Sequence, residues 1–122
     1  MKPIIYVGLG GAAGSICRYL AQMWIGRAAP SAFPLGTFLV NISGCLLIGL
    51  LYGMASKFGW FTMEWRLLLI TGICGGYTTF SSYSYEGISL LRQGNYLYFG
   101  LYVGGSVVLG LLATFLGTIL IK

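Results

Sequence analysis

The side chains that could bind an ion or donate hydrogen bonds are densest in residues 72–86, where glycines, hydroxyl residues and aromatic rings follow one another. These residues lie within a hydrophobic segment of about residues 67–91, which is long enough to cross a bilayer. Glycine weakens a helix, and serine and threonine offer the backbone competing hydrogen bonds. We therefore expect the segment to unwind between about Gly75 and Thr79. Broken membrane helices commonly bind ions, although a kinked helix packed through small residues also fits this pattern.

One amide and two rings are the strongest candidates for contact with a small anion. Asn41 lies within a hydrophobic segment, where an unpaired amide would be costly, so it must face protein, water or an ion. A hydrogen bond between helices accounts for Asn41 equally well. Phe80 and Tyr83 are three residues apart after the expected break, and the positive edges of their rings can contact an anion. Ordinary packing is the simpler account of the rings unless other donors converge on them.

Hydroxyl side chains supply further donors. Thr37 precedes Asn41 by four residues and shares its helical face. Ser106, Gly110 and Thr114 recur every four residues and form a stripe, for which close helix contact is a sufficient explanation. Three serines follow the first ring of the broken segment: Ser81, Ser82 and Ser84.

Two charged residues lie well inside hydrophobic segments. Arg18 stands about seven residues before the end of the first segment, and Glu86 stands about six residues before Arg92, at the corresponding end of the third. Similar depth on one side of the membrane favours a pair between Arg18 and Glu86. Each side chain can instead extend to the membrane surface by itself.

The composition is that of a membrane protein with few acid–base groups. Of the 122 residues, 57% are hydrophobic and 7% are charged, whereas ordinary soluble domains carry about 25% charged residues. Histidine is absent and Glu64 and Glu86 are the only acids, which argues against an enzyme and against a carboxylate metal site. The lysines and arginines form no cluster that would bind nucleic acid. The three cysteines stand singly in apolar stretches and lack the spacing of a disulfide or metal motif.

Four hydrophobic runs predict four membrane-spanning helices in a single domain, residues 1–122. The runs cover about residues 4–25, 35–55, 67–91 and 96–121. Each contains two glycines four residues apart, a spacing that lets membrane helices approach closely or oligomerise. The pairs are Gly10/Gly14, Gly49/Gly53, Gly72/Gly76 and Gly100/Gly104.

Basic residues flank the expected spans. Four of them fall on the side that holds both termini: Lys2, Lys57, Arg66 and Lys122. Arg27 and Arg92 fall on the other side, which has three basic residues if Arg18 is counted. Because basic loops set orientation, so small a difference permits insertion both ways round.

Three motifs stand in order along the chain. The first is Gly10-Gly11-x-x-Gly14-x-x-x-Arg18, and the second is Gly36-Thr37-x-x-x-Asn41-x-x-Gly44. The third and most specific is Gly72-x-x-Gly75-Gly76-Tyr77-Thr78-Thr79-Phe80-Ser81, followed by Glu86. With the length and the four spans, these motifs resemble the CrcB, or Fluc, family of small fluoride channels along the whole chain.

The resemblance implies an all-α membrane protein with four transmembrane helices, the third broken at mid-membrane. It implies an antiparallel, dual-topology homodimer with two pores, which exports toxic fluoride passively across the lipid bilayer of the bacterial plasma membrane. It also implies a structural sodium ion (Na+) at the dimer centre, held by the backbone carbonyls of Gly75 and Thr78. The pore residues that it implies are Asn41, Phe80, Tyr83, Ser81, Ser82, Thr37, Ser106 and Thr114.

The chain departs from the family pattern in two places. The usual Thr-Phe-Ser-Thr-Phe is here Thr79-Phe80-Ser81-Ser82-Tyr83, which keeps a hydroxyl and a ring but adds a phenol. Gly110 leaves a gap in the polar stripe. The added phenol bears on the conduction rate and not on the fold.

Two other classes of function stay open. A small multidrug-resistance-type exporter, coupled to protons, would need an acid in its first span, where this chain has none. A structural or assembly subunit would not need the polar break.

Overall fold

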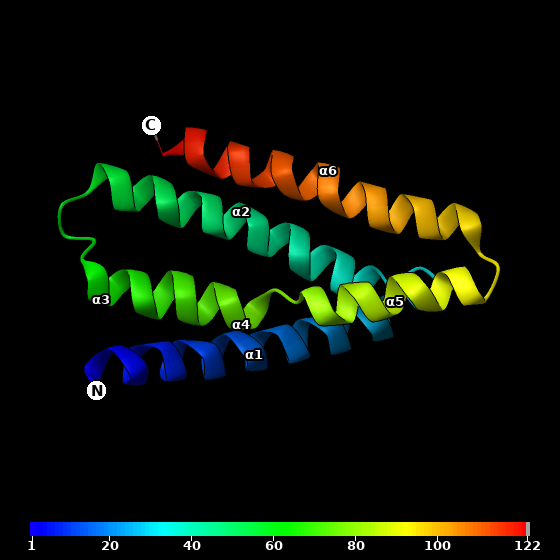
Figure 1. Ribbon diagram of the computed structural model, residues 1–122, viewed down its shortest axis with the longest axis horizontal. Helices are drawn as coiled ribbons and strands as arrows, with labels where there is room; N and C mark the ends of the chain where they lie inside the picture. Colours follow the sequence, from blue (N-terminus) through cyan, green and yellow to red (C-terminus); the bar gives the residue numbers. More distant parts are fainter. Residues whose placement is uncertain (122) are drawn as a thin grey trace.

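The computed structural model describes residues 1–121, and all the regular elements among them are helices, laid in rows that each run opposite to the row before it in the chain (Figure 1). The N-terminus and the C-terminal end of α6 lie at the same end of the bundle, as the expected even number of passes requires. Lys122, which was expected at this end, lies outside the described residues. The elements are α1 Lys2–Ala28, α2 Leu35–Lys57, α3 Met63–Trp65, η1 Arg66–Cys74, α4 Gly75–Tyr77, α5 Phe80–Arg92 and α6 Tyr96–Leu120.

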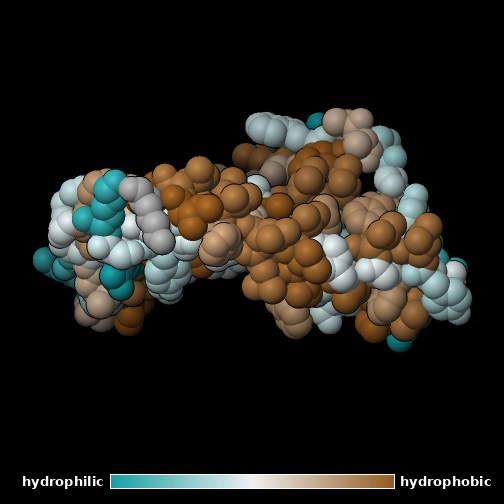
Figure 2. Space-filling view, turned by 90° about the horizontal axis from the view of Figure 1, so that it is seen from above, coloured by the Kyte–Doolittle hydropathy of each residue, from teal (hydrophilic) through white to brown (hydrophobic). Residues whose placement is uncertain are grey.

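Three of these helices, α1, α2 and α6, are long and apolar enough to cross a membrane. At about 1.5 Å per residue they extend about 35 to 40 Å, which exceeds the hydrocarbon thickness of about 30 Å. The third expected span is instead divided into the short pieces α3 to α5. Figure 2 shows apolar residues over the middle of one face, with hydrophilic residues gathered toward the two ends. The structure is therefore that of a multi-pass membrane protein.

The predicted break of the third row is present, and it is narrower than expected. Thr78 and Thr79 have extended backbones, with ψ of 155° and 116°, whereas residues 75–77 stay helical. Before the break, η1 is a π-helix of nine residues, wound more widely than an α-helix. A new helix, α5, begins at Phe80, and the Thr79 hydroxyl caps it by accepting a hydrogen bond from the Ser82 amide.

Close glycine contacts pack the rows together. A Cβ atom added to Gly10 would lie 2.8 Å from the Cα of Gly72, so α1 and η1 touch backbone to backbone. A Cβ atom on Gly49 would lie 3.1 Å from the Cα of Gly117, which joins α2 to α6 in the same way. The glycine pair in the first half of α6 has no such neighbour among the described residues. Close packing is thus confirmed inside the subunit for the first three pairs and not for the fourth.

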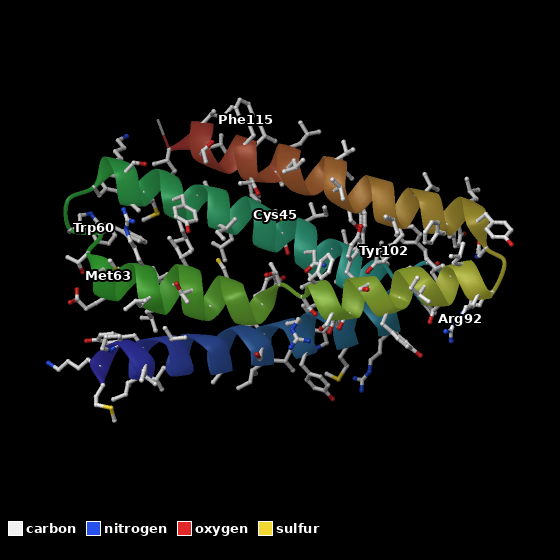
Figure 3. All side chains as sticks on the ribbon, viewed as in Figure 1. Cys45, Trp60, Met63, Arg92, Tyr102 and Phe115 are labelled. Atoms are coloured by element: carbon white, nitrogen blue, oxygen red, sulfur yellow. The ribbon has the colours of Figure 1, made fainter. Side chains whose placement is uncertain are left out.

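The two ends of the bundle differ in chemistry. Figure 3 shows Trp60 at one end and Arg92 at the other. Near Trp60, a hydrogen bond with the Thr62 side chain lowers the pKa of the exposed Glu64 below its ordinary value. Near the opposite end, the ring of Phe33 packs edge-on against Tyr102, with 5.5 Å between ring centroids. This contact fixes the loop after α1 against α6 and helps to bury Tyr102 completely.

Candidate functional site

The side chain of Asn41 clamps the break of the third row. Its Oδ1 accepts a hydrogen bond from the Thr79 amide at 2.9 Å, and its Nδ2 donates to the Thr79 carbonyl at 3.1 Å. The Thr79 amide lacks a helical acceptor because the chain is extended here, so α2 supplies a replacement, and the Thr79 carbonyl gains a further donor from the same side chain. An amide nitrogen carries two hydrogens, which leaves Asn41 one more donor for another ligand.

Two more side chains hold the residues around the break. Arg18 on α1 donates from Nε to the Gly76 carbonyl at 3.1 Å. Thr78 donates its own hydroxyl to the Cys74 carbonyl at 2.9 Å, and its amide bonds to the same carbonyl at 3.0 Å. Groups from α1 and α2 therefore stabilise a turn that the local sequence alone would leave flexible.

Two carbonyls at the break lose their usual helical donors. In a continuous α-helix, the amide of Thr79 would bond to Gly75, and the amide of Ser82 would bond to Thr78. Here the Thr79 amide bonds to Asn41, and the Ser82 amide bonds to the Thr79 hydroxyl at 3.2 Å. The carbonyl oxygens of Gly75 and Thr78 therefore need another donor or a cation.

A cavity of about 330 Å³ lies beside the break, between α2, α5 and α6. It brings together four residues that the sequence predicts as pore residues, and its lining contains no charged side chain. The hydroxyl oxygen of Ser106 is buried and has no hydrogen-bond partner within residues 1–121. A donor is thus available at the wall of this cavity. The lining residues are Asn41, Gly44, Cys45, Ile48, Thr78, Thr79, Phe80, Tyr83, Ser106 and Val107.

The phenol of Tyr83 does not offer its hydrogen to the cavity. It donates to the Val103 carbonyl of α6 at 2.8 Å. The Tyr83 ring lies between two others, with centroids 5.7 Å from Phe80 and 5.2 Å from Tyr102. The hydroxyl of Tyr83 is therefore bound to α6, and contact of its ring edge with an anion stays a prediction.

Three other predicted hydroxyl residues, Thr37, Ser81 and Ser82, line a second cavity of about 410 Å³. A hydrogen-bonded chain crosses its wall: Gln22 donates to the Thr37 hydroxyl at 2.9 Å, and Thr37 donates to the Glu86 carboxylate at 2.6 Å. Gln22 was missed from the sequence, where its only signal is its position four residues after Arg18 on the same face of α1. The cavity is lined by Gln22, Thr37, Ser81, Ser82, Tyr85 and Glu86.

The structure differs from the predictions for the Arg18–Glu86 pair and for Thr114. Arg18 and Glu86 do not pair directly: within residues 1–121 no hydrogen bond or ion pair joins them, because Arg18 bonds to α4 and Glu86 bonds to α2. Their pairing through a water molecule stays a prediction. Thr114 lines neither of the two cavities and donates to the Cys45 carbonyl at 3.1 Å, so it serves a contact between helices. A place for Thr114 in an ion path stays a prediction.

Comparison with known proteins connects this arrangement to one family. The family model described as CrcB-like protein, Camphor Resistance (CrcB), matches residues 5–118. The chain belongs to the CrcB family. A relative from Flavobacterium psychrophilum is 48% identical over 122 residues, which cover 100% of this chain and 98% of the relative. A relative from Phocaeicola vulgatus is 47% identical, with 96% of each chain covered.

Both CrcB relatives carry the name fluoride-specific ion channel FluC, as does a protein from Bacteroides fragilis that is 48% identical over 96% of this chain and 94% of its own length. All three organisms are bacteria. The expected location, a multi-pass protein of the bacterial plasma membrane, is confirmed by these relatives together with the three membrane-length helices.

Proposed function

We propose that this chain forms a fluoride-selective channel that lets toxic fluoride leave the cell passively. The observation that carries the proposal is the uncharged cavity at the break, which is lined jointly by Asn41, Ser106, Phe80 and Tyr83. A strongly hydrated small anion needs donors to replace its water, and conduction needs those donors to hold it weakly. The names of the relatives support fluoride as the ion.

The proposed channel is an antiparallel homodimer in which η1, α4 and α5 together make the third of four membrane crossings in each subunit. Support comes from the exposed surface of α5 in the single subunit, where Phe80 is 78% and Tyr85 is 73% exposed. Ser81 and Ser84 are also exposed on this helix. Hydroxyls facing lipid would be costly, so a second copy is the expected cover. Since each subunit contributes one cavity beside its break, the dimer would have two pores.

A structural sodium ion fits the break. The carbonyl oxygens of Gly75 and Thr78 have lost their helical donors, and two copies of the break would meet on the dimer axis if that axis lies at mid-membrane. Within residues 1–121 no group of three or more His, Cys, Asp or Glu side chains could hold a metal. Hard, uncharged oxygen donors suit a monovalent cation better than a soft or divalent one. Sodium bound by these carbonyls would neutralise their partial negative charge and join the two subunits.

Ion efflux from liposomes containing the purified protein tests the proposal. We expect fast release of fluoride, little release of chloride, no proton-coupled export of a cationic dye, and slower fluoride release when choline replaces sodium on both sides. Dye export without fluoride release would support the multidrug exporter, and release of neither would support an assembly subunit. Fluoride release that does not depend on sodium would refute the sodium site and leave the channel in place.

A further inference from the structure

Gly44 differs from the glycines that pack one helix backbone on another. A Cβ atom added to Gly10 or Gly49 would meet the backbone of a neighbouring helix. A Cβ atom added to Gly44 would instead meet the two side chains at the break, overlapping the Cγ2 methyl of Thr78 and lying 3.1 Å from Cδ2 of Tyr77. Gly44 is buried and lies three residues after Asn41, so both residues face the break from the same side of α2.

Neither of these neighbours is free to move away. The χ1 rotation of Thr78 is fixed by the hydrogen bond from its hydroxyl to the Cys74 carbonyl at 2.9 Å, and β-branched side chains are stiff at χ1. The ring of Tyr77 is held by the 2.9 Å hydrogen bond between its hydroxyl and that of Ser43. A methyl group on residue 44 would therefore displace the backbone of residues 77–78 and not only a side chain.

We propose that Gly44 is a positioning residue of the channel. Because it has no Cβ atom, the methyl group of Thr78 can pack against its Cα, and this contact fixes the direction of the Thr78 carbonyl. The inference rests on the proposed function, since that carbonyl is one of the proposed sodium ligands and Thr78 also lines the cavity with Asn41. One face of α2 then positions both residues of the break. The amide of Asn41 binds the backbone of Thr79, and the space left by the missing Cβ of Gly44 holds the side chain of Thr78.

Two substitutions, one that adds a methyl group at residue 44 and one that removes a methyl group at residue 78, test the inference singly and together. Gly44→Ala adds one carbon and Thr78→Ser removes the Cγ2 that it would strike, while serine keeps the hydroxyl that bonds to Cys74. We expect Gly44→Ala to lower fluoride efflux about tenfold or more and to raise the sodium concentration that gives half-maximal efflux. Thr78→Ser is the reference for the double variant, whose efflux should lie within about threefold of that of Thr78→Ser. Gly104→Ala is the matched control, because no atom of residues 1–121 of the subunit lies within 4 Å of its added Cβ.

Two measurements keep the inference separate from the proposed function. Melting temperature and amide exchange at residues 77–82 should be disturbed in Gly44→Ala and restored in the double variant, whether or not the protein conducts fluoride. If the unmodified chain released no fluoride, the proposed function would fail and these measurements would still decide the role of Gly44. If Gly44→Ala gave too little folded dimer for efflux, recovery of the dimer in the double variant would support the inference. Gly44→Ala matching Gly104→Ala, or a double variant as impaired as Gly44→Ala, would overturn it.

Discussion

Asn41→Asp exchanges an amide for a carboxylate of nearly the same shape at the point where α2 meets the break. The carboxylate can still accept from the Thr79 amide, which bonds to Oδ1 at 2.9 Å. It cannot donate to the Thr79 carbonyl, which now accepts from Nδ2 at 3.1 Å. Two oxygens would face each other there, and a negative charge would stand at the wall of the cavity beside Phe80 and Tyr83. We expect fluoride efflux to be abolished.

Two contributions give the size of the effect. Losing the donor and leaving the Thr79 carbonyl unpaired costs about 1 to 3 kcal/mol in stability. A fixed negative charge about 5 Å from a passing anion costs about 3 kcal/mol at an effective dielectric constant of about 20. The second figure corresponds to about 100-fold lower occupancy by fluoride. We therefore expect the added charge to lower fluoride efflux strongly, while the lost hydrogen bond lowers the stability of the fold by a smaller or equal free energy.

Efflux from liposomes, scaled to the amount of dimer measured by size-exclusion chromatography, gives the comparison. Asn41→Ala is the control, because it removes both hydrogen bonds to Thr79 without adding charge. The aspartate variant should be about 100-fold slower than the alanine variant. Equal loss in both variants would refute the charge argument and leave Asn41 as a clamp of the break. Normal efflux from Asn41→Asp would refute its role in the ion path altogether.

Three further predictions concern side chains around the cavities. Tyr83→Phe should conduct at least as well as the unmodified chain, because the phenol donates to a carbonyl of α6; a clearly slower variant would make the hydroxyl an anion ligand. Thr37→Val should lower stability by about 1 to 3 kcal/mol in thermal unfolding, because it breaks two hydrogen bonds of a residue that is 3% exposed. Thr118→Val, which removes a bond within one exposed turn, should change stability far less, and an equal change would contradict this account. Arg18→Met should destabilise the dimer more than Arg27→Met, because only Arg18 supports the broken row; equal melting temperatures would show that its hydrogen bond adds nothing.

The spans and the existence of a break could be predicted because both follow from local composition. The limits of the break could not, because they depend on contacts between rows. Glycine-rich residues 75–77 stay helical, and Gly76 lies so close to α1 that an added Cβ would be 2.5 Å from the Gly11 carbonyl. The chain extends at Thr78 and Thr79, where Asn41 offers substitute hydrogen bonds. The π-helical winding of η1 had no signal in the sequence pattern.

Some of the site residues could likewise be predicted from the sequence, and others could not. Asn41, Phe80, Tyr83 and Ser106 could be selected by residue type and spacing, and they line one cavity. Gln22 acquires its role only when folding brings Thr37 and Glu86 to it, so its position four residues after Arg18 could not by itself identify that role. Depth along a helix also says nothing of which way a side chain turns about the helix axis. For this reason Arg18 and Glu86, similar in depth, bond to different helices.

The gap in the polar stripe of α6 has a physical explanation in the packing of α2. A Cβ atom on Gly110 would lie 3.3 Å from the sulfur of Cys45, so the thiol occupies the space that a larger residue would need. One turn later, the hydroxyl of Thr114 donates a hydrogen bond to the carbonyl of the same cysteine. A stripe with a period of four residues therefore changes function along its length. Ser106 lines the cavity, and its buried hydroxyl has no hydrogen-bond partner within residues 1–121, whereas the later positions pack α6 against α2. Sequence periodicity identifies the face of a helix, but only the neighbouring helix decides where that face is open to an ion.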